Sequence, residues 1–168
     1  GVIFGYRFTV EGTYNYDCSV GSHAANGMVG SFIVNPVSVV YTNIPDQNFE
    51  QALIDLEIDD VVDGQVLTSS INTVDELDIA SMNISDLSGI EGFVELTALN
   101  CGNNNLTTID LSQNINLSLL AAHDNQLTAI DISNNEKLIE IDVEVNQLTS
   151  LDITNNTDLK ILFCAENQ

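Results

Sequence analysis

The 168-residue sequence contains few basic side chains. Only 3 lysines and arginines stand against 25 aspartates and glutamates, which gives a formal net charge of −22. This charge excludes a nucleic-acid-binding function, because contacts with phosphates require clustered lysine and arginine. Anionic membrane surfaces are disfavoured as partners for the same reason. Cations and basic protein surfaces stay open as partners, and so does a simple role of the charge in solubility.

The sequence also lacks tryptophan, and it has no apolar run of the roughly 20 residues that a membrane helix needs. We therefore predict no membrane insertion. It has no nucleophile–histidine–acid set, phosphate-binding glycine loop or zinc-ligand spacing, so we do not expect an enzyme. No signal peptide or initiator methionine is present, and the sequence stops inside a repeat. We interpret it as a fragment of a longer protein.

A 21-residue repeat fills the second half of the sequence. We divide it into units 74–95, 96–116, 117–137 and 138–158 and a partial unit 159–168. Two of its apolar columns are Leu96, Leu117, Leu138, Leu159 and Leu99, Leu120, Ile141, Leu162. One repeat cannot bury its apolar face alone, so each unit must be covered by its neighbours. We expect Leu99, Leu120, Ile141 and Leu162 to stack in one interior file.

Two asparagine columns accompany the apolar ones: Asn104, Asn125, Asn146, Asn167 and Asn114, Asn135, Asn156. Asparagine side chains can bond turn backbone groups that have no strand partner, so we predict a ladder of asparagines at a turn. Two short apolar alternations in each unit, such as Leu99 with Cys101 and Ile109 with Leu111, predict two short strands per turn of the solenoid.

The pattern LxxLxCxxNxLxxLDLxxNxx resembles the short leucine-rich repeat of secreted bacterial proteins, over residues 74–168. The resemblance implies a mainly β solenoid that binds a protein or glycan, in a secreted or cell-surface bacterial protein. The outward columns beside the first strand vary, as expected if they face a ligand, although exposed positions can also simply drift. The predicted binding surface consists of Leu119, Ala121, His123, Glu140, Asp142, Glu144, Ile161 and Phe163.

Residues 44–73 are expected to form a helical cap at the N-terminal end of the solenoid. Asp46 can cap a helix, and an apolar stripe follows it at helical spacing: Phe49, Ala52, Leu53 and Leu56. The segment resembles the entry segment of secreted bacterial leucine-rich-repeat proteins. The spacing of Asp59, Asp60 and Asp63 matches no EF-hand pattern, so we favour a solvated turn over a calcium site.

The first 35 residues carry a different motif, in which Cys18, His23 and Met28 are spaced C-x4-H-x4-M. It resembles the last two strands and ligand loop of a cupredoxin (plastocyanin-like) domain. That resemblance implies copper bound by a thiolate, an imidazole, a weak axial thioether and a second histidine from far upstream. The only other histidine is His123, in the repeats, so the copper site is incomplete here and is expected only in an intact parent. An incidental loop is the alternative. Residues 36–43 are interpreted as a linker.

Three cysteines do not make a disulfide framework. Cys101 and Cys164 lie three repeats apart, which is about 14 Å in a solenoid with rungs about 4.8 Å apart. A disulfide needs Cα atoms within about 7 Å, so we expect two buried, unpaired thiols. Another column stacks three aspartates, Asp110, Asp131 and Asp152, beside hydroxyl side chains. Their mutual repulsion is relieved either by hydrogen bonds from those neighbours or by bound cations.

The sequence thus leaves three functions open. The first is a protein- or glycan-binding solenoid. The second is electron transfer by a copper-binding domain of the intact parent, with the repeats as a spacer. The third is a targeting appendage for a catalytic domain that lies outside this sequence.

Overall fold

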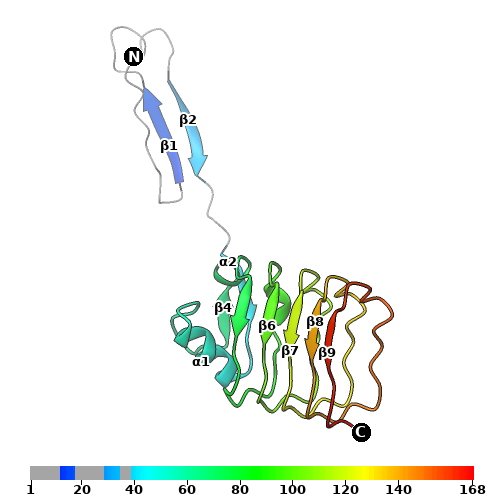
Figure 1. Ribbon diagram of the computed structural model, residues 1–168. Coiled ribbons are helices and arrows are strands. Elements are labelled where there is room, and N and C mark those ends of the chain that lie inside the picture. The colour runs from blue at the N-terminus through cyan, green and yellow to red at the C-terminus, as the bar shows by residue number, and fades with distance from the viewer. Residues whose placement is uncertain (1–11, 18–28, 35–38) are drawn as a thin grey trace. The chain divides into compact units, whose positions relative to one another are not determined.

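The computed structural model describes residues 12–17, 29–34 and 39–168. The chain divides into two units, Gly1–Val39 and Val40–Gln168. In the first unit, strand β1 (Gly12–Asp17) pairs with strand β2 (Val29–Val34) in an antiparallel hairpin (Figure 1). The proposed copper ligands Cys18, His23 and Met28 lie outside the described residues.

The second unit begins with two short strands that we had not predicted. Strand β3 (Tyr41–Asn43) pairs antiparallel with β4 (Gln65–Leu67). We had expected residues 41–43 to belong to a linker. The hydroxyl oxygens of Thr42 and Thr68 lie 2.9 Å apart, and Val66 is fully buried, so this pairing closes a small hydrogen-bonded layer over the core. The short helix α2 (Thr68–Ile71) follows directly.

Helix α1 (Gln47–Asp55) lies between β3 and β4 in the sequence, and its first turn is fixed by Asp46. The Oδ1 atom of Asp46 accepts hydrogen bonds from the backbone N–H groups of Asn48 (2.9 Å) and Phe49 (3.1 Å). Its Oδ2 atom accepts three more, from the N–H and hydroxyl of Ser85 and the N–H of Asp86. One carboxylate therefore caps the helix and ties it to the first repeat.

The buried face of α1 joins the hydrophobic core of the repeats. Phe49 is fully buried and stacks on Phe93, with ring centroids 6.3 Å apart. Glu50 is buried as well, and its Oε1 atom accepts hydrogen bonds from the backbone N–H groups of residues 63, 64 and 65 at 2.8, 2.6 and 3.1 Å. The turn that holds Asp63 is thus fixed by a protein carboxylate.

Five parallel strands form the continuous sheet of the solenoid, with one strand from each repeat (Figure 1). They are β5 (Glu76–Asp78), β6 (Ala98–Asn100), β7 (Leu119–Ala121), β8 (Glu140–Asp142) and β9 (Ile161–Phe163). The predicted file of Leu99, Leu120, Ile141 and Leu162 is confirmed by the strand register, and Leu77 extends it on β5.

The burial of this file depends on having a rung on both sides. Leu99, Leu120 and Ile141 have no exposed surface, whereas Leu162 is 38 % exposed. Leu162 lies on β9, which pairs with β8 alone. The same position explains why Cys164 is exposed, against our prediction, while Cys101 is buried as expected.

The prediction of a second strand in each repeat is wrong. The back half of the repeats contains only one isolated bridge among the described residues, between Asp110 and Asp131. The N–H of Ser112 donates instead to the side chain of Asp110 at 2.9 Å. Such local side-chain bonds compete with strand pairing. The alternation of Ile109 with Leu111 therefore reflects burial rather than a β ladder.

The asparagine ladder forms as the sequence predicted. Asn104, Asn125 and Asn146 are buried, and each side-chain amide donates to backbone carbonyls of its own rung and of the preceding one. Each Oδ1 atom also accepts a bond from a backbone N–H of the preceding rung. These side chains link successive turns where no strand does.

Candidate binding surface

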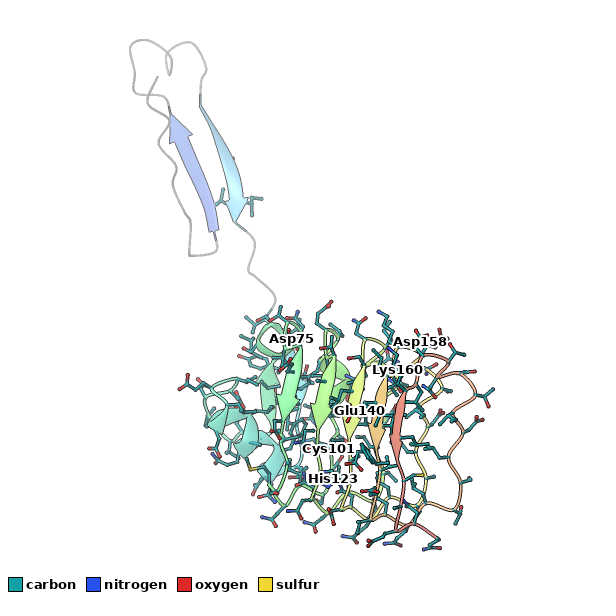
Figure 2. The ribbon with its side chains drawn as sticks, in the orientation of Figure 1. Asp75, Cys101, His123, Glu140, Asp158 and Lys160 are labelled. Carbon is teal, nitrogen blue, oxygen red and sulfur yellow. The ribbon has the colours of Figure 1, made fainter. Side chains whose placement is uncertain are left out.

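The outward side chains of β5 to β9, with those just after each strand, form one face that we call the strand face. They lie in three columns: Glu76, Ala98, Leu119, Glu140, Ile161; Asp78, Asn100, Ala121, Asp142, Phe163; and Ala80, Gly102, His123, Glu144, Ala165. Every residue of the predicted binding surface therefore lies on this face. Figure 2 shows Glu140 within the strand layer and His123 near the carboxyl ends of the strands.

The middle of the strand face is uncharged and carries mostly small side chains. On β6 and β7 the outward residues are Ala98, Asn100, Leu119 and Ala121, each half-buried. Beyond the strands, the ring of His123 packs against Gly102. A Cβ atom on that glycine would lie 2.5 Å from His123 Nε2 and 2.7 Å from Cε1. With the ring in this position a larger residue at 102 would require the His123 side chain to shift, so the surface is low at this point.

His123 itself is half-buried. Its Nδ1 atom lies 3.0 Å from the Oδ2 atom of Asp124. This contact fixes one side of the imidazole near the strand ends. The sequence does not reveal the packing of His123 against Gly102, because Gly102 contributes to it only by having no side chain.

Acidic side chains flank the uncharged middle on both sides. Glu76 and Asp78 lie on β5, and Glu140, Asp142 and Glu144 lie on or just after β8. The Oδ1 atoms of both aspartates accept the backbone N–H two residues later, at 3.2 Å for Asp78 and 3.1 Å for Asp142. In the part of the chain that the structure describes, no lysine or arginine pairs with these carboxylates, since the one ion pair there is His123–Asp124.

Ile161 and Phe163 are the most apolar exposed members of the strand face, at 40 % and 45 % exposure. Both lie on β9. Their inward neighbour Leu162 is similarly exposed, so their accessibility reflects the single-sided pairing of this strand.

The aspartate column on the back of the repeats is explained by hydrogen bonds. Asp110, Asp131 and Asp152 each accept the backbone N–H two residues later, at 2.9 Å. The backbone N–H of Ser112 lowers the pKa of Asp110 below its usual value. The hydroxyl groups of residues 133 and 154 do the same for the pKa of Asp131 and of Asp152. Local donors therefore offset the repulsion among the stacked carboxylates.

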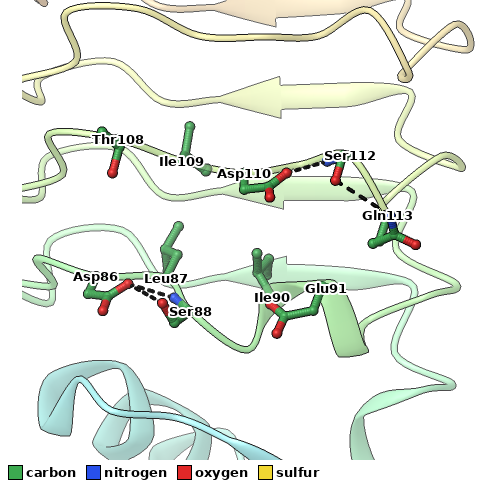
Figure 3. Close-up of a pocket in the computed structure, with 10 residues that line it drawn as sticks. All are labelled: Asp86, Leu87, Ser88, Ile90, Glu91, Thr108, Ile109, Asp110, Ser112 and Gln113. Atoms are coloured by element: carbon green, nitrogen blue, oxygen red, sulfur yellow. Dashed lines mark hydrogen bonds between the residues drawn. The ribbon is translucent and has the colours of Figure 1, made fainter.

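A hollow of about 430 Å³ lies on the back half of the first two repeats (Figure 3). Several of its polar side chains already accept hydrogen bonds from neighbouring residues. Asp86 accepts the N–H and hydroxyl of Ser88 at 2.8 and 2.7 Å, and Glu91 accepts the N–H of Gly89 at 2.8 Å. The hollow contains no histidine, cysteine, lysine or arginine. Its serine hydroxyls and carboxylates have no histidine or lysine among the lining residues to activate them.

The thiols and carboxylates of the described residues form no metal centre: no group of three or more His, Cys, Asp or Glu is placed to hold an ion there. Cys101 and Cys164 are both free. Burial raises the pKa of the Cys101 thiol to about 12, so this side chain stays protonated and inert. No helix in the described part of the chain is long and apolar enough to cross a membrane.

Comparison with known proteins identifies the fold. No protein-family model matches the chain. Internalin J of Listeria monocytogenes serotype 4b (strain F2365) is 38 % identical over 73 residues, which are 42 % of this chain but 8 % of that protein. The structure of the functional domain of InlJ from Listeria monocytogenes, described as including a cysteine ladder, matches with a TM-score of 0.70 and 34 % identity. That match covers 79 % of this chain and 30 % of the other.

A second internalin, InlF of Listeria monocytogenes strain 4b F2365, shares the fold with a TM-score of 0.63 at 21 % identity, over 74 % of this chain and 44 % of the other. The solenoid is therefore an internalin-like leucine-rich-repeat structure, as the repeat pattern predicted. In this chain, Ala122 and Val143 stand between Cys101 and Cys164 in one column of the repeat.

Proposed function

We propose that this internalin-like chain is a non-enzymatic module that binds a protein through its strand face, within a secreted or cell-surface bacterial protein. The observation that carries the proposal is the contrast between the two sides of one sheet. The inward column keeps Leu or Ile on all five strands, whereas the outward columns change chemistry at each rung. The scaffold is constant and the exposed face is particular to this chain, as expected for a recognition surface.

The shape of the face favours a protein over a small ligand. Small-molecule sites are concave and enclosed, whereas five strands at about 4.8 Å spacing make a layer about 20 Å wide. Protein partners typically cover about 800 Å² on each side. Ala98 and Ala121 at the centre leave room for the close approach of a partner. A glycan remains the alternative ligand.

The test uses one matched pair of substitutions. Ala121→Arg places a long charged side chain at the centre of the strand face, and Ala129→Arg makes the same change at an exposed position on the back half of the same repeat. Immobilised wild type and both variants are incubated with a panel of purified extracellular proteins and with a glycan array. We expect a protein ligand that binds wild type and Ala129→Arg equally and Ala121→Arg at least about tenfold more weakly. A ligand that tolerates both variants, or a glycan lost only with Ala121→Arg, would contradict the proposal.

Copper binding in an intact parent remains a second proposal. Thiolate, imidazole and thioether ligands, as in Cys18, His23 and Met28, suit copper. The antiparallel pairing of β1 with β2, which flank this segment in the sequence, supports it. The missing element is a second histidine ligand, because the only other histidine of the chain is His123. An intense blue colour when Cu²⁺ is added to a longer parent protein, and its loss in Cys18→Ser, would support this role. A colourless protein would exclude it.

The third hypothesis, a targeting appendage, depends on sequence beyond this chain. The chain spans 8 % of the length of Internalin J and 30 % of the InlJ structure. A catalytic domain encoded beside it would make the strand face a means of delivery.

A further inference from the structure

The charges of the strand face are grouped into two acidic rungs with an uncharged interval between them. The first rung carries Glu76 and Asp78, and the second carries Glu140, Asp142 and Glu144. The two strands between them, β6 and β7, have no outward acidic residue. Three strand spacings separate the acidic rungs, which is about 14 Å.

The acidic rungs are uncompensated by the chain itself. No ion pair in the described ranges involves their carboxylates. Asp78 and Asp142 are also held in place, because one oxygen of each accepts a backbone N–H while the other remains available. A carboxylate that is already oriented loses less side-chain entropy when it pairs with a cation than a freely rotating one does.

The interval between the acidic rungs is suited to apolar contact. Ala98, Leu119 and Ala121 are half-buried, and the ring of His123 packs against Gly102. Side chains here are short, so a bound segment can approach the backbone of β6 and β7 closely. Pairing of cations on both sides would then exclude water from the apolar middle, the arrangement usual at protein interfaces.

We propose that the strand face binds a basic polypeptide segment, with lysine or arginine on the two acidic rungs and small or aliphatic residues on the interval between. This inference rests on the proposed function and names the chemistry of the partner. Charge complementarity decides the occupant. A second copy of the chain carries the same net charge of −22 and is repelled, and nucleic acid is repelled for the same reason.

The probe is a fluorescein-labelled peptide with two lysine–arginine pairs separated by three alanine or leucine residues. When it is extended, its inner cationic residues lie about 13 Å apart, which matches the separation of the rungs. A peptide of the same composition with all four basic residues adjacent serves as the spacing control. Binding is measured by fluorescence anisotropy at low and at high salt.

Two variants that each remove three negative charges distinguish the effect of the strand face from the effect of the overall net charge. Glu140→Gln, Asp142→Asn and Glu144→Gln together neutralise the second acidic rung. Asparagine at 142 can still accept the local N–H, as Asn100 does two rungs earlier in the same column. The control neutralises three exposed acids away from the strands with Glu95→Gln, Glu136→Gln and Asp158→Asn.

We expect the spaced peptide to bind the strand-face variant roughly tenfold more weakly than wild type, since each exposed ion pair contributes up to about 1 kcal/mol. The control variant should stay within about twofold of wild type. Equal weakening of both variants, equal binding of the two peptides, or no binding to wild type at low salt would each overturn the inference. If the protein ligand found above is lost with Ala121→Arg but retained by the strand-face charge variant, the proposed function stands and only the basic partner fails.

Discussion

Removal of one ladder asparagine tests how the solenoid holds its turns together. The side-chain amide of Asn125 donates to the carbonyls of Cys101 (3.0 Å), Ala122 (3.2 Å) and His123 (3.1 Å). Its Oδ1 atom accepts the backbone N–H of Leu106 at 3.0 Å. Asn125→Ala removes all four bonds at a site with 9 % exposure, where water cannot easily replace them.

The expected loss of stability depends on which partner groups of Asn125 keep another hydrogen bond after the substitution. All three carbonyls keep another donor: Cys101 O accepts the amide of Asn104, Ala122 O that of Asn146, and His123 O the N–H of Asn103. Only the buried N–H of Leu106 is left unpaired, which costs about 1–3 kcal/mol, and each lost carbonyl bond costs about 0.5 kcal/mol more. We therefore expect Asn125→Ala to lower the free energy of unfolding by about 3 kcal/mol.

The assay is urea denaturation of the whole chain followed by far-ultraviolet circular dichroism. Asn105→Ala is the matched control, because Asn105 is exposed and its side chain makes no hydrogen bond within the described residues. We expect the control to lie within about 0.5 kcal/mol of wild type. If Asn125→Ala falls within about 1 kcal/mol of that control, the amide ladder does not hold the turns and the reasoning is wrong.

Three further substitutions or treatments have defined outcomes. Burial raises the pKa of Asp46, but the hydrogen bonds that its carboxylate accepts outweigh this effect and leave the pKa lowered. The carboxylate therefore stabilises the fold above about pH 4, and this stabilisation is lost as the pH falls through the lowered pKa. The difference in urea midpoint between wild type and Asp46→Asn should accordingly be largest at neutral pH and shrink in acid. Alkylation with iodoacetamide at pH 8, read by peptide mass mapping, should label Cys164 and spare Cys101, whose pKa is raised to about 12 by burial; rapid labelling of Cys101 in the native chain would show that the core opens. Val145 is β-branched with a φ of 52°, so Val145→Asn should raise the free energy of unfolding by about 1 kcal/mol, and a loss of stability would argue against backbone strain there.

The inward half of the fold could be predicted because burial imposes the same demand on every repeat. Leu99, Leu120 and Ile141 occupy equivalent positions with no exposed surface, and one spacing locates them all. The positions of the ladder asparagines can be predicted equally well, since a turn that lacks strand partners needs a side chain that both donates and accepts hydrogen bonds. In both cases, the sequence pattern repeats because the physical environment does.

The features that could not be predicted depend on contacts that do not recur from one repeat to the next. Strand β3 has its partner β4 more than 20 residues away, and no short-range pattern marks that pairing. The back half of each repeat alternates like a strand, yet the side chain of Asp110 takes the N–H that a strand would use. The exposure of Cys164 follows from its place directly after the last strand, which its column in the repeat does not reveal.

The outward columns show where sequence reasoning stops. Periodicity identified which residues face outward, but it could not separate variation under selection from drift. The structure removes one position from that uncertainty, because Gly102 is outward-facing and yet constrained by the ring of His123. A larger residue at 102 would require the His123 side chain to shift, so these two positions on neighbouring rungs are in direct contact. At this point the chemistry of the strand face depends on two adjacent rungs together, so substitutions at 102 and 123 are best tested as a pair.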